Sequence, residues 1–187
     1  MTRHLLRIVV VIATAIVLAT LQTTTPPYAM LTGPIRTTGP ASETVAGKTF
    51  SLKVRTVAKA KTIAYDQFGT AVALQSSGVW VVVSAQLQGF DQTMPIRAAT
   101  IVGSSGRLYR LSQRAGGAPN ILSAKTLQPG LPTSGLFIFE MPEDETTAMT
   151  LVVSEQYDPQ LQDEIAVSLA PDAAPPRERL EIGPDGI

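Results

Sequence analysis

Cysteine is absent from the 187-residue chain, and His4 is its only histidine. Without cysteine the chain can form no disulfide, no thiolate nucleophile, no cysteine metal ligand and no lipidated N-terminal cysteine. With one histidine, any Ser-His-Asp triad or histidine-ligated metal site would have to use His4. These two shortages exclude several common catalytic and metal-binding arrangements before any motif is considered.

Aromatic residues and charged residues are also scarce, at 5% and 16% of the chain. The basic residues are spread thinly with few aromatic residues among them, so we expect no nucleic-acid binding. The charges are divided unevenly: residues 46–125 hold ten Lys or Arg and two acids, whereas residues 126–187 hold two and twelve. Because they are scattered through strand-like segments, we expect basic and acidic strands to lie side by side in one domain. A strongly charged partner is the alternative.

The N-terminal segment combines a basic start with an apolar run. Arg3, His4 and Arg7 precede residues 8–21, which carry no charge, and this order is typical of an export signal or an N-terminal anchor. A 14-residue run spans about 21 Å as a helix, short of a roughly 30 Å hydrocarbon core, although flanking residues extend it. Residues 27–29 match a cleavage site poorly. We therefore favour residues 1–24 as an uncleaved transmembrane signal anchor.

This anchor predicts where the rest of the chain lies. Arginines on the short N-terminal side keep that end in the cytoplasm. His4 is then separated by the membrane from everything that follows Thr25. We predict a single-pass cell-membrane protein with its C-terminal domain outside, or a secreted protein if the segment is cleaved.

Three further segments follow the anchor. Residues 25–45 hold four prolines and two glycines, a composition that predicts an unfolded stalk. Residues 46–170 have the alternating apolar and polar pattern of a β domain. Residues 171–187 are again rich in proline and glycine, and predict a flexible C-terminal tail.

Alternation of apolar and polar residues is the main signal within the domain. Residues 48–60 alternate with period two, which predicts a half-buried strand. Residues 78–88 form the strongest strand, with Trp80 in its buried start. Two extended runs, 95–102 and 107–111, flank a Gly-Ser-Ser-Gly segment and predict a hairpin. With seven to nine short strands and no helical stripe, the domain is predicted to be an all-β, antiparallel, immunoglobulin-like β-sandwich.

Three local expectations follow from turn residues and apolar runs. Residues 70–74 predict a short strand that ends in a turn at 76–78. Residues 136–139, Leu-Phe-Ile-Phe, predict a central strand covered on both faces. The acids 143–145 that follow it predict a solvated turn.

Several stretches, taken in order, resemble a bacterial exported family of immunoglobulin-like domains of unknown function. They are Gly78–Val83, Tyr109 after a glycine turn, Leu127 with Pro129-Gly130, and Gly135–Pro142. The family is often labelled "telomeric repeat-binding factor 2-like" and is similar in fold to a small immunogenic secreted antigen of mycobacteria. The resemblance covers residues 46–170 and implies a fold and an extracytoplasmic location. It supplies no catalytic residues.

Few residues could take part in catalysis or metal binding. Ser51 with Lys53, and Ser123 with Lys125, stand two apart and would share a strand face, but chance pairing is the better explanation without a desolvated lysine and an oxyanion hole. Carboxylates could supply hard oxygen ligands for calcium if two acidic groups met at one end of the sandwich. The calcium candidates are Glu143, Asp144, Glu145, Asp158, Asp163 and Glu164.

The sequence therefore favours a non-enzymatic module over an enzyme. We expect a cell-envelope domain that recognises another protein, held to the membrane by its N-terminal helix, with no catalytic residue and no cofactor. The alternative function is binding of calcium or another small ligand by the exported domain.

Overall fold

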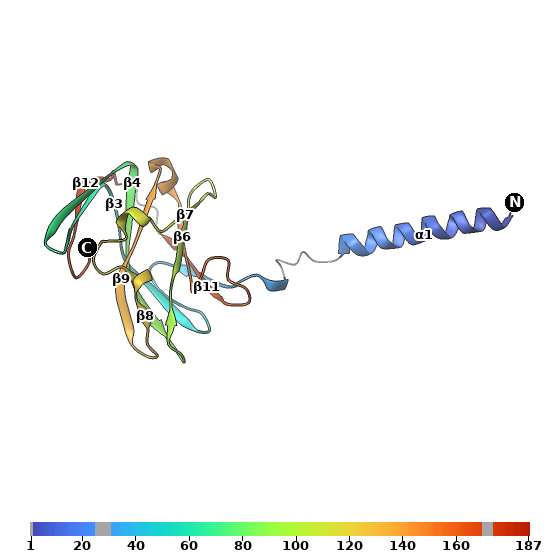
Figure 1. Ribbon diagram of the computed structural model, residues 1–187, viewed down its shortest axis with the longest axis horizontal. Helices are drawn as coiled ribbons and strands as arrows, with labels where there is room; N and C mark the ends of the chain where they lie inside the picture. The colour runs from blue at the N-terminus through green and yellow to red at the C-terminus, as the bar shows by residue number, and fades with distance from the viewer. Residues whose placement is uncertain (1, 25–30, 170–173) are drawn as a thin grey trace. The chain divides into compact units, whose positions relative to one another are not determined.

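The computed structural model describes residues 2–24, 31–169 and 174–187, and contacts divide the chain into units 1–33 and 34–187. The first unit contains helix α1, Thr2–Thr24 (Figure 1). Its 23 residues reach about 34 Å at 1.5 Å per residue, enough to cross a hydrocarbon core. The mean hydropathy of its apolar part is 2.3, so length and composition both permit a membrane span.

Four threonines of α1, Thr14, Thr20, Thr23 and Thr24, satisfy their hydroxyl groups within the helix. Thr14 Oγ1 donates to the carbonyl of Val10 at 2.9 Å, and Thr20 Oγ1 donates to that of Val17 at 2.8 Å. Such bonds remove the penalty that a free hydroxyl meets in hydrocarbon. These polar residues are therefore compatible with an apolar surrounding.

The second unit is built from two five-stranded sheets and a two-stranded ribbon. The first sheet has the order β1-β11-β10-β6-β7, with bounds Ile35–Pro40, Asp163–Leu169, Met149–Ser154, Ala98–Val102 and Leu108–Arg110. The second has the order β12-β3-β4-β9, with β2 also paired to β3; the bounds are Arg177–Ile182, Phe50–Gln67, Thr70–Gly89, Pro132–Met141 and Thr44–Ala46. The ribbon pairs β5, Met94–Pro95, with β8, Thr126–Leu127. Three 3₁₀ turns complete the elements: η1 Gln113–Ala115, η2 Leu122–Ala124 and η3 Glu143–Thr147.

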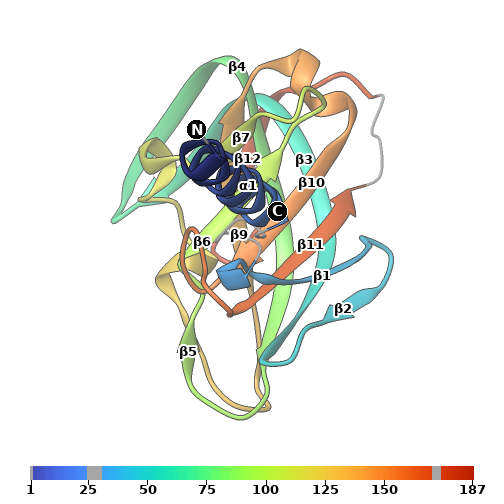
Figure 2. The same ribbon diagram turned by 90° about the vertical axis from the view of Figure 1, so that its right-hand side faces the viewer.

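The two large sheets face each other as a β-sandwich, as predicted (Figure 2). Most pairs are antiparallel, but β1–β11 and β12–β3 are parallel. The chain changes sheet between β1 and β2, because β2 pairs with β3. The twelve strands described exceed the predicted seven to nine because several of them, such as β2, β5 and β8, are only two or three residues long.

The main core lies between the sheets. It takes the inward side chains of β3, β4 and β9 from one sheet and those of β6, β10 and β11 from the other. Period-two alternation places these side chains on one face of each strand. The largest fully buried members are Phe50, Leu52, Leu87, Ile96, Ile101, Leu122, Leu127, Phe137 and Phe139.

A second core covers the other face of β3, β4 and β9. Trp80, Leu136 and Ile138 pack there with Ala115 and Ala118 from the chain around η1, and with side chains of β12. Trp80 is fully buried, which confirms its predicted place in the core. Where they pass under this second core, β4 and β9 are therefore apolar on both sides.

The predicted turn at residues 76–78 is wrong, because β4 continues through it. Residues 76–79 form a bulge opposite Lys61, and pairing with β3 resumes at Trp80. Gly78 is required here because a Cβ would lie 2.3 Å from the carbonyl oxygen of Met141. The bulge lets the Trp80 indole donate a hydrogen bond to the carbonyl of Leu74 at 2.9 Å. The bulge therefore orients the Trp80 side chain.

Both boundaries of the predicted domain, 46 and 170, need correction. Within the predicted stalk 25–45, residues 25–30 lie outside the described part, but β1 pairs in full with β11, and β2 begins at Thr44. Within the predicted tail 171–187, β12 pairs with β3, and Leu180 and Ile182 are buried. Proline and glycine did not prevent these short segments from pairing with strands that the core already holds in place.

The strand predicted at 136–139 is buried on both faces, as expected, but it lies at an edge of its sheet rather than in the centre. The outer side of β9 is covered by the chain at 111–121 instead of another strand. Ser112 N donates to the carbonyl of Ile138, and Leu136 N donates to that of Asn120, both at 2.9 Å. The loop backbone at 111–121 therefore provides hydrogen-bond partners for the outer edge of β9, where another strand would otherwise pair.

Part of the uneven charge distribution is balanced by ion pairs within the second unit. Lys61 pairs with Glu143 at 2.5 Å, and Arg114 pairs with Glu140 at 2.6 Å. Each pair joins a basic residue of 46–125 to an acid of 126–187. The two halves therefore exchange charges within one unit, but not between neighbouring strands as expected, because Glu143 lies in η3 and Arg114 lies in η1.

Candidate functional site

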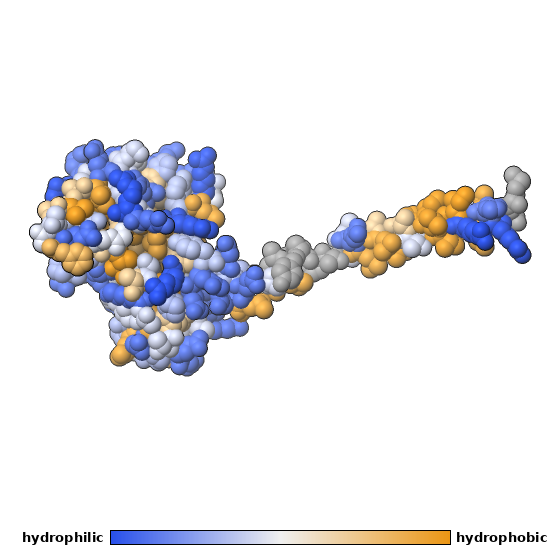
Figure 3. Space-filling model, in the orientation of Figure 1, coloured by the Kyte–Doolittle hydropathy of each residue, from blue (hydrophilic) through white to orange (hydrophobic). Residues whose placement is uncertain are grey.

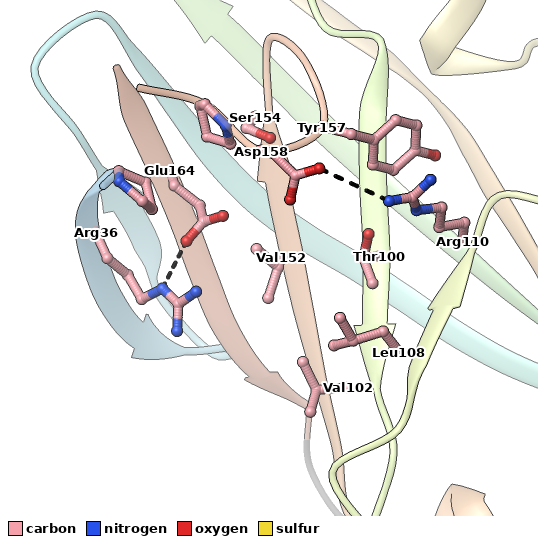
Figure 4. Close-up of a pocket in the computed structure, with 12 residues that line it drawn as sticks. Arg36, Thr100, Val102, Leu108, Arg110, Val152, Ser154, Tyr157, Asp158 and Glu164 are labelled. Atoms are coloured by element: carbon pink, nitrogen blue, oxygen red, sulfur yellow. Dashed lines mark hydrogen bonds and ion pairs between the residues drawn. The ribbon is translucent and has the colours of Figure 1, made fainter. Parts of the chain in front are cut away.

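A hollow lies on the outer face of the first sheet, away from the main core (Figure 4). This outer pocket has a volume of about 270 Å³. It is lined by outward side chains of all five strands and by the loop after β10. The lining residues are Pro34, Arg36, Thr100, Val102, Leu108, Arg110, Val152, Ser154, Tyr157, Asp158, Pro159 and Glu164.

One side of the outer pocket holds a fixed ion pair. Arg36 of β1 stands opposite Glu164 of β11 in the register, and its Nε donates to Glu164 Oε1 at 2.6 Å. The Glu164 side chain is only 9% exposed, whereas that of Arg36 is 54% exposed. A carboxylate removed from water needs its counter-ion, so Arg36 is committed to Glu164.

The opposite side holds a looser arrangement around Arg110 of β7. Its guanidinium carbon lies 4.4 Å from the centre of the Tyr157 ring. Its ion pair with Asp158 is 3.9 Å long, and the Asp158 side chain is 94% exposed. An exposed pair of this length contributes about 0–1 kcal/mol. Arg110 is thus oriented by the ring but available to another anion.

The floor between the two arginines is apolar. Val102 and Val152 face outward there, and Leu108 stands at the rim with 67% exposure. The hydroxyl of Ser154 donates to the carbonyl of Gln156 at 2.8 Å, and the lining residues include no histidine or lysine to activate it. The chemistry of this lining is binding: an apolar group on the valines and an anion at Arg110.

The structure does not bring the calcium candidates together. Glu143, Asp144 and Glu145 lie in η3 before β10, whereas Asp158 follows β10 at its other end. The six residues of β10 separate the two groups by roughly 17 Å of strand. Among the described residues, no cluster of three or more possible metal ligands occurs.

The last two candidates, Asp163 and Glu164, begin β11 and have different partners. Asp163 points inward and accepts hydrogen bonds from Thr49 N at 2.5 Å and Thr49 Oγ1 at 2.9 Å. Glu164 points outward to Arg36. Neighbouring residues of a strand face opposite sides, so these two carboxylates cannot share an ion.

Glu145 is buried, so the predicted solvated turn is wrong at this residue. Its carboxylate accepts hydrogen bonds from Ser105 Oγ at 2.5 Å and Ser105 N at 3.0 Å, and thereby holds the β6–β7 turn. The Ser105 hydroxyl and backbone N–H lower the pKa of Glu145, and Arg107 adds to them, while burial opposes the shift. The β6–β7 turn therefore stabilises the ionised form of the Glu145 carboxyl group.

This contact predicts a pH dependence of stability. Because the folded pKa of Glu145 lies below its usual value of 4.5, its stabilising effect is present above that value and is lost as the pH falls through the folded pKa. We expect Glu145→Gln to lower the melting temperature at neutral pH, and the gap from the wild type to narrow at acid pH. Melting curves at several pH values check this. Glu178→Gln, at an exposed position, controls for charge removal; a constant gap for Glu145→Gln would contradict the prediction.

The Ser-Lys pairs do not form catalytic dyads. Lys125 Nζ donates to Asn120 Oδ1 and to the carbonyl of Ser134 rather than to Ser123, and burial lowers the pKa of Lys125. Ser51 and Lys53 share a face, as predicted, beside a shallow hollow of about 240 Å³. No hydrogen bond joins these two side chains in the described structure.

Analysis of the sequence missed the outer pocket. One signal was present: Val152 stands between Leu151 and Val153, so β10 is apolar on both faces. An apolar residue on an outward face indicates a covered or binding surface. The convergence of Arg36 and Arg110 on this face depends on strand order, which no local pattern contains.

Comparisons with known proteins agree with this fold. No protein-family model matches the chain, and no curated protein matches it. Among solved structures, a secreted protein of Mycobacterium tuberculosis, MPT63, is similar with a TM-score of 0.51 and 15% identity, over 72% of this chain and 97% of that one. The yjhA protein of Bacillus subtilis has a TM-score of 0.51 and 13% identity, over 70% and 98%. The shared feature is the β-sandwich.

A third structure, an uncharacterised β-sandwich protein of Clostridium difficile 630, has a TM-score of 0.45 and 11% identity, over 72% and 95%. Identities this low indicate the fold alone. The resemblance to a mycobacterial secreted antigen is supported at that level. The label "telomeric repeat-binding factor 2-like" has no support, because no family model matches.

Proposed function

We propose that this chain is a membrane-anchored, extracytoplasmic binding module that recognises another protein through the outer pocket, without catalysis. The observation that carries the proposal is the state of the two arginines. Arg36 is fixed by a buried carboxylate at 2.6 Å, whereas Arg110 is oriented by Tyr157 and only loosely paired with Asp158. One oriented, weakly paired cation beside an apolar floor is suited to an acidic and apolar ligand.

A protein segment fits this chemistry better than calcium does. Its carboxylate would replace Asp158 at Arg110, and an apolar side chain would cover the outward valines. The pocket volume of about 270 Å³ is near the lower limit of small-molecule sites, and is sufficient for one or two side chains. Both sides of the lining offer binding groups rather than a nucleophile and its base.

Helix α1 supports the membrane location. It is 23 residues long and has arginines only near its N-terminal end, which favours a cytoplasmic N-terminus. The second unit would then lie outside. The fold it shares with a secreted protein is compatible with that location.

Photo-crosslinking in cells of the native host tests the proposal. A benzoylphenylalanine in place of Leu108 should give a discrete adduct in membranes washed at high pH, a step that removes chains not held by α1. Arg110→Glu should reduce the adduct at least about tenfold, equivalent to 1.4 kcal/mol. Arg179→Glu, on the other sheet and paired with Glu181, is the matched control.

Two results would contradict the proposal. Loss of the chain in the alkaline wash would refute membrane anchoring. An adduct that Arg110→Glu and Arg179→Glu affect equally would show that the outer pocket does not select the partner.

A further inference from the structure

The hairpin of β3 and β4 extends beyond β9, while β12 follows its β3 side as far as Tyr65 (Figure 1). Strand β4 pairs with β9 only from Val79 onward. Residues 70–73 of β4 therefore pair with β3 on one side, and on the other side no described backbone pairs with them. The carbonyl of Gln75 accepts a hydrogen bond from Arg114 at 3.0 Å and marks the end of this open edge, residues 70–73.

The open edge differs from the other outer edges of the two sheets. Strand β12 carries four charged residues, β1 carries an arginine and ends in a proline, β7 has three residues, and β9 is covered by residues 111–121. Charge, proline, shortness and coverage are the means by which natural edges avoid pairing with other chains. Residues 70–73, Thr-Ala-Val-Ala, belong to a long strand, hold no charge or proline, and form no hydrogen bond with described backbone on their outer edge.

The turn next to the open edge is also unusual. Phe68 and Gly69 form the two-residue loop, with φ values of 54° and 82°, a conformation that favours Asn-Gly. A bulky aromatic residue with positive φ is strained, and Phe68 is 100% exposed. In Figure 3 hydrophobic residues gather on the side of the sandwich where this hairpin lies. A strained, fully exposed phenylalanine beside an open edge points to a role outside the isolated fold.

We infer that the open edge pairs antiparallel with the same edge of a second copy of this chain, about a two-fold axis that passes through residues 71–73. An uncharged edge is compatible with itself, because every residue near a two-fold axis meets its own copy and any charge there would be repelled. Phe68 then packs against the partner copy. The paired sheets continue across the dimer.

The short edge makes a weak interface in dilute solution. The proposed membrane anchor strengthens it, because copies held in one bilayer have a high effective concentration. The inference therefore uses the location from the proposed function, but it does not depend on the outer pocket, which lies on the other sheet.

Cysteine crosslinking tests the inference cleanly, since the chain has no cysteine of its own. Single cysteines in place of Ala71, Val72 and Ala73, in the full chain in native membranes, should form disulfide dimers, fastest at the position on the axis. Thr38→Cys, exposed on β1, is the control and should crosslink at least about tenfold more slowly. Equal rates at all four positions, or disulfides to a different protein, would overturn the inference.

Second substitutions keep the test independent of folding. Ala71 and Ala73 are exposed, so Ala71→Lys should leave the fold intact and suppress the crosslinking of Ala73→Cys; mixing it with an Ala71→Glu copy should restore that crosslinking. Phe68→Asn should raise the melting temperature by about 2–4 °C by relieving strain, yet slow crosslinking. Arg110→Glu should leave crosslinking unchanged, which separates this inference from the pocket. Crosslinking that Ala71→Lys does not suppress would refute self-pairing.

Discussion

Ending the chain after Leu169 is expected to lower the free energy of unfolding of the second unit by about 3–6 kcal/mol. The estimate follows from the loss of two buried side chains, Leu180 and Ile182, at roughly 1.5–3 kcal/mol each. They are 5% and 4% exposed and stand opposite Ile63 and Tyr65 in the register. Without β12, those two partners and part of the second core would face water.

This loss is large against the 5–15 kcal/mol that typically stabilises a domain. Urea unfolding of the full and shortened chains in the same detergent, followed by fluorescence of the single tryptophan, measures it. The matched control is Arg179→Ala with Glu181→Ala, which changes the outward face of the same strand and should shift stability by less than about 1 kcal/mol. An unchanged urea midpoint for the shortened chain would mean that the C-terminal segment is a free tail after all.

Trp80→Ala should destabilise the second unit by about 3–5 kcal/mol, the usual range for removing a buried aromatic residue. Trp80 is fully buried, and its indole N–H satisfies the carbonyl of Leu74 across the bulge at 2.9 Å. The substitution therefore leaves a cavity and an unsatisfied carbonyl together. Because the variant loses its tryptophan, unfolding is followed by far-ultraviolet circular dichroism.

The control for Trp80→Ala is a substitution of Arg114, which lies over the Trp80 ring. The guanidinium of Arg114 lies 5.3 Å from the Trp80 ring and pairs with Glu140 at 2.6 Å, and its side chain is 51% exposed. Arg114→Ala removes a cation–π contact and a surface ion pair, which together contribute about 1–2 kcal/mol. Equal losses for the two variants would show that the indole itself adds little to the second core.

Alternation of apolar and polar residues was sufficient to predict the sandwich, because each strand buries one face and the period is local. The hairpin of β6 and β7 was predictable for the same reason, with glycine and serine between two extended runs. Position within a sheet was not predictable. Residues 136–139 are apolar on both faces whether β9 has a strand or a loop beside it, so burial alone could not distinguish a central strand from a covered edge.

The acidic residues show the same limit of prediction from local sequence. Glu143, Glu145 and Glu164 all follow turn-like or polar signals in the chain, yet they find a lysine, a serine turn and an arginine respectively. These partners are 82, 40 and 128 residues away in sequence. A local pattern states that an acid is present but not which partner the fold will bring to it.

By itself the sequence determined the all-β class, the apolar N-terminal helix and the absence of cysteine and histidine chemistry from the folded unit. These follow from composition and short-range periodicity. Only the tertiary structure decided that the segments at 35–40 and 177–182 are strands, that Arg36 and Arg110 line one pocket, and that the edge at 70–73 has no partner among the described backbone. The physical reason is that strand pairing is a long-range choice: β12 joins β3 across more than a hundred residues, and the free energy that selects this partner comes from surfaces that exist only once the sheets have formed.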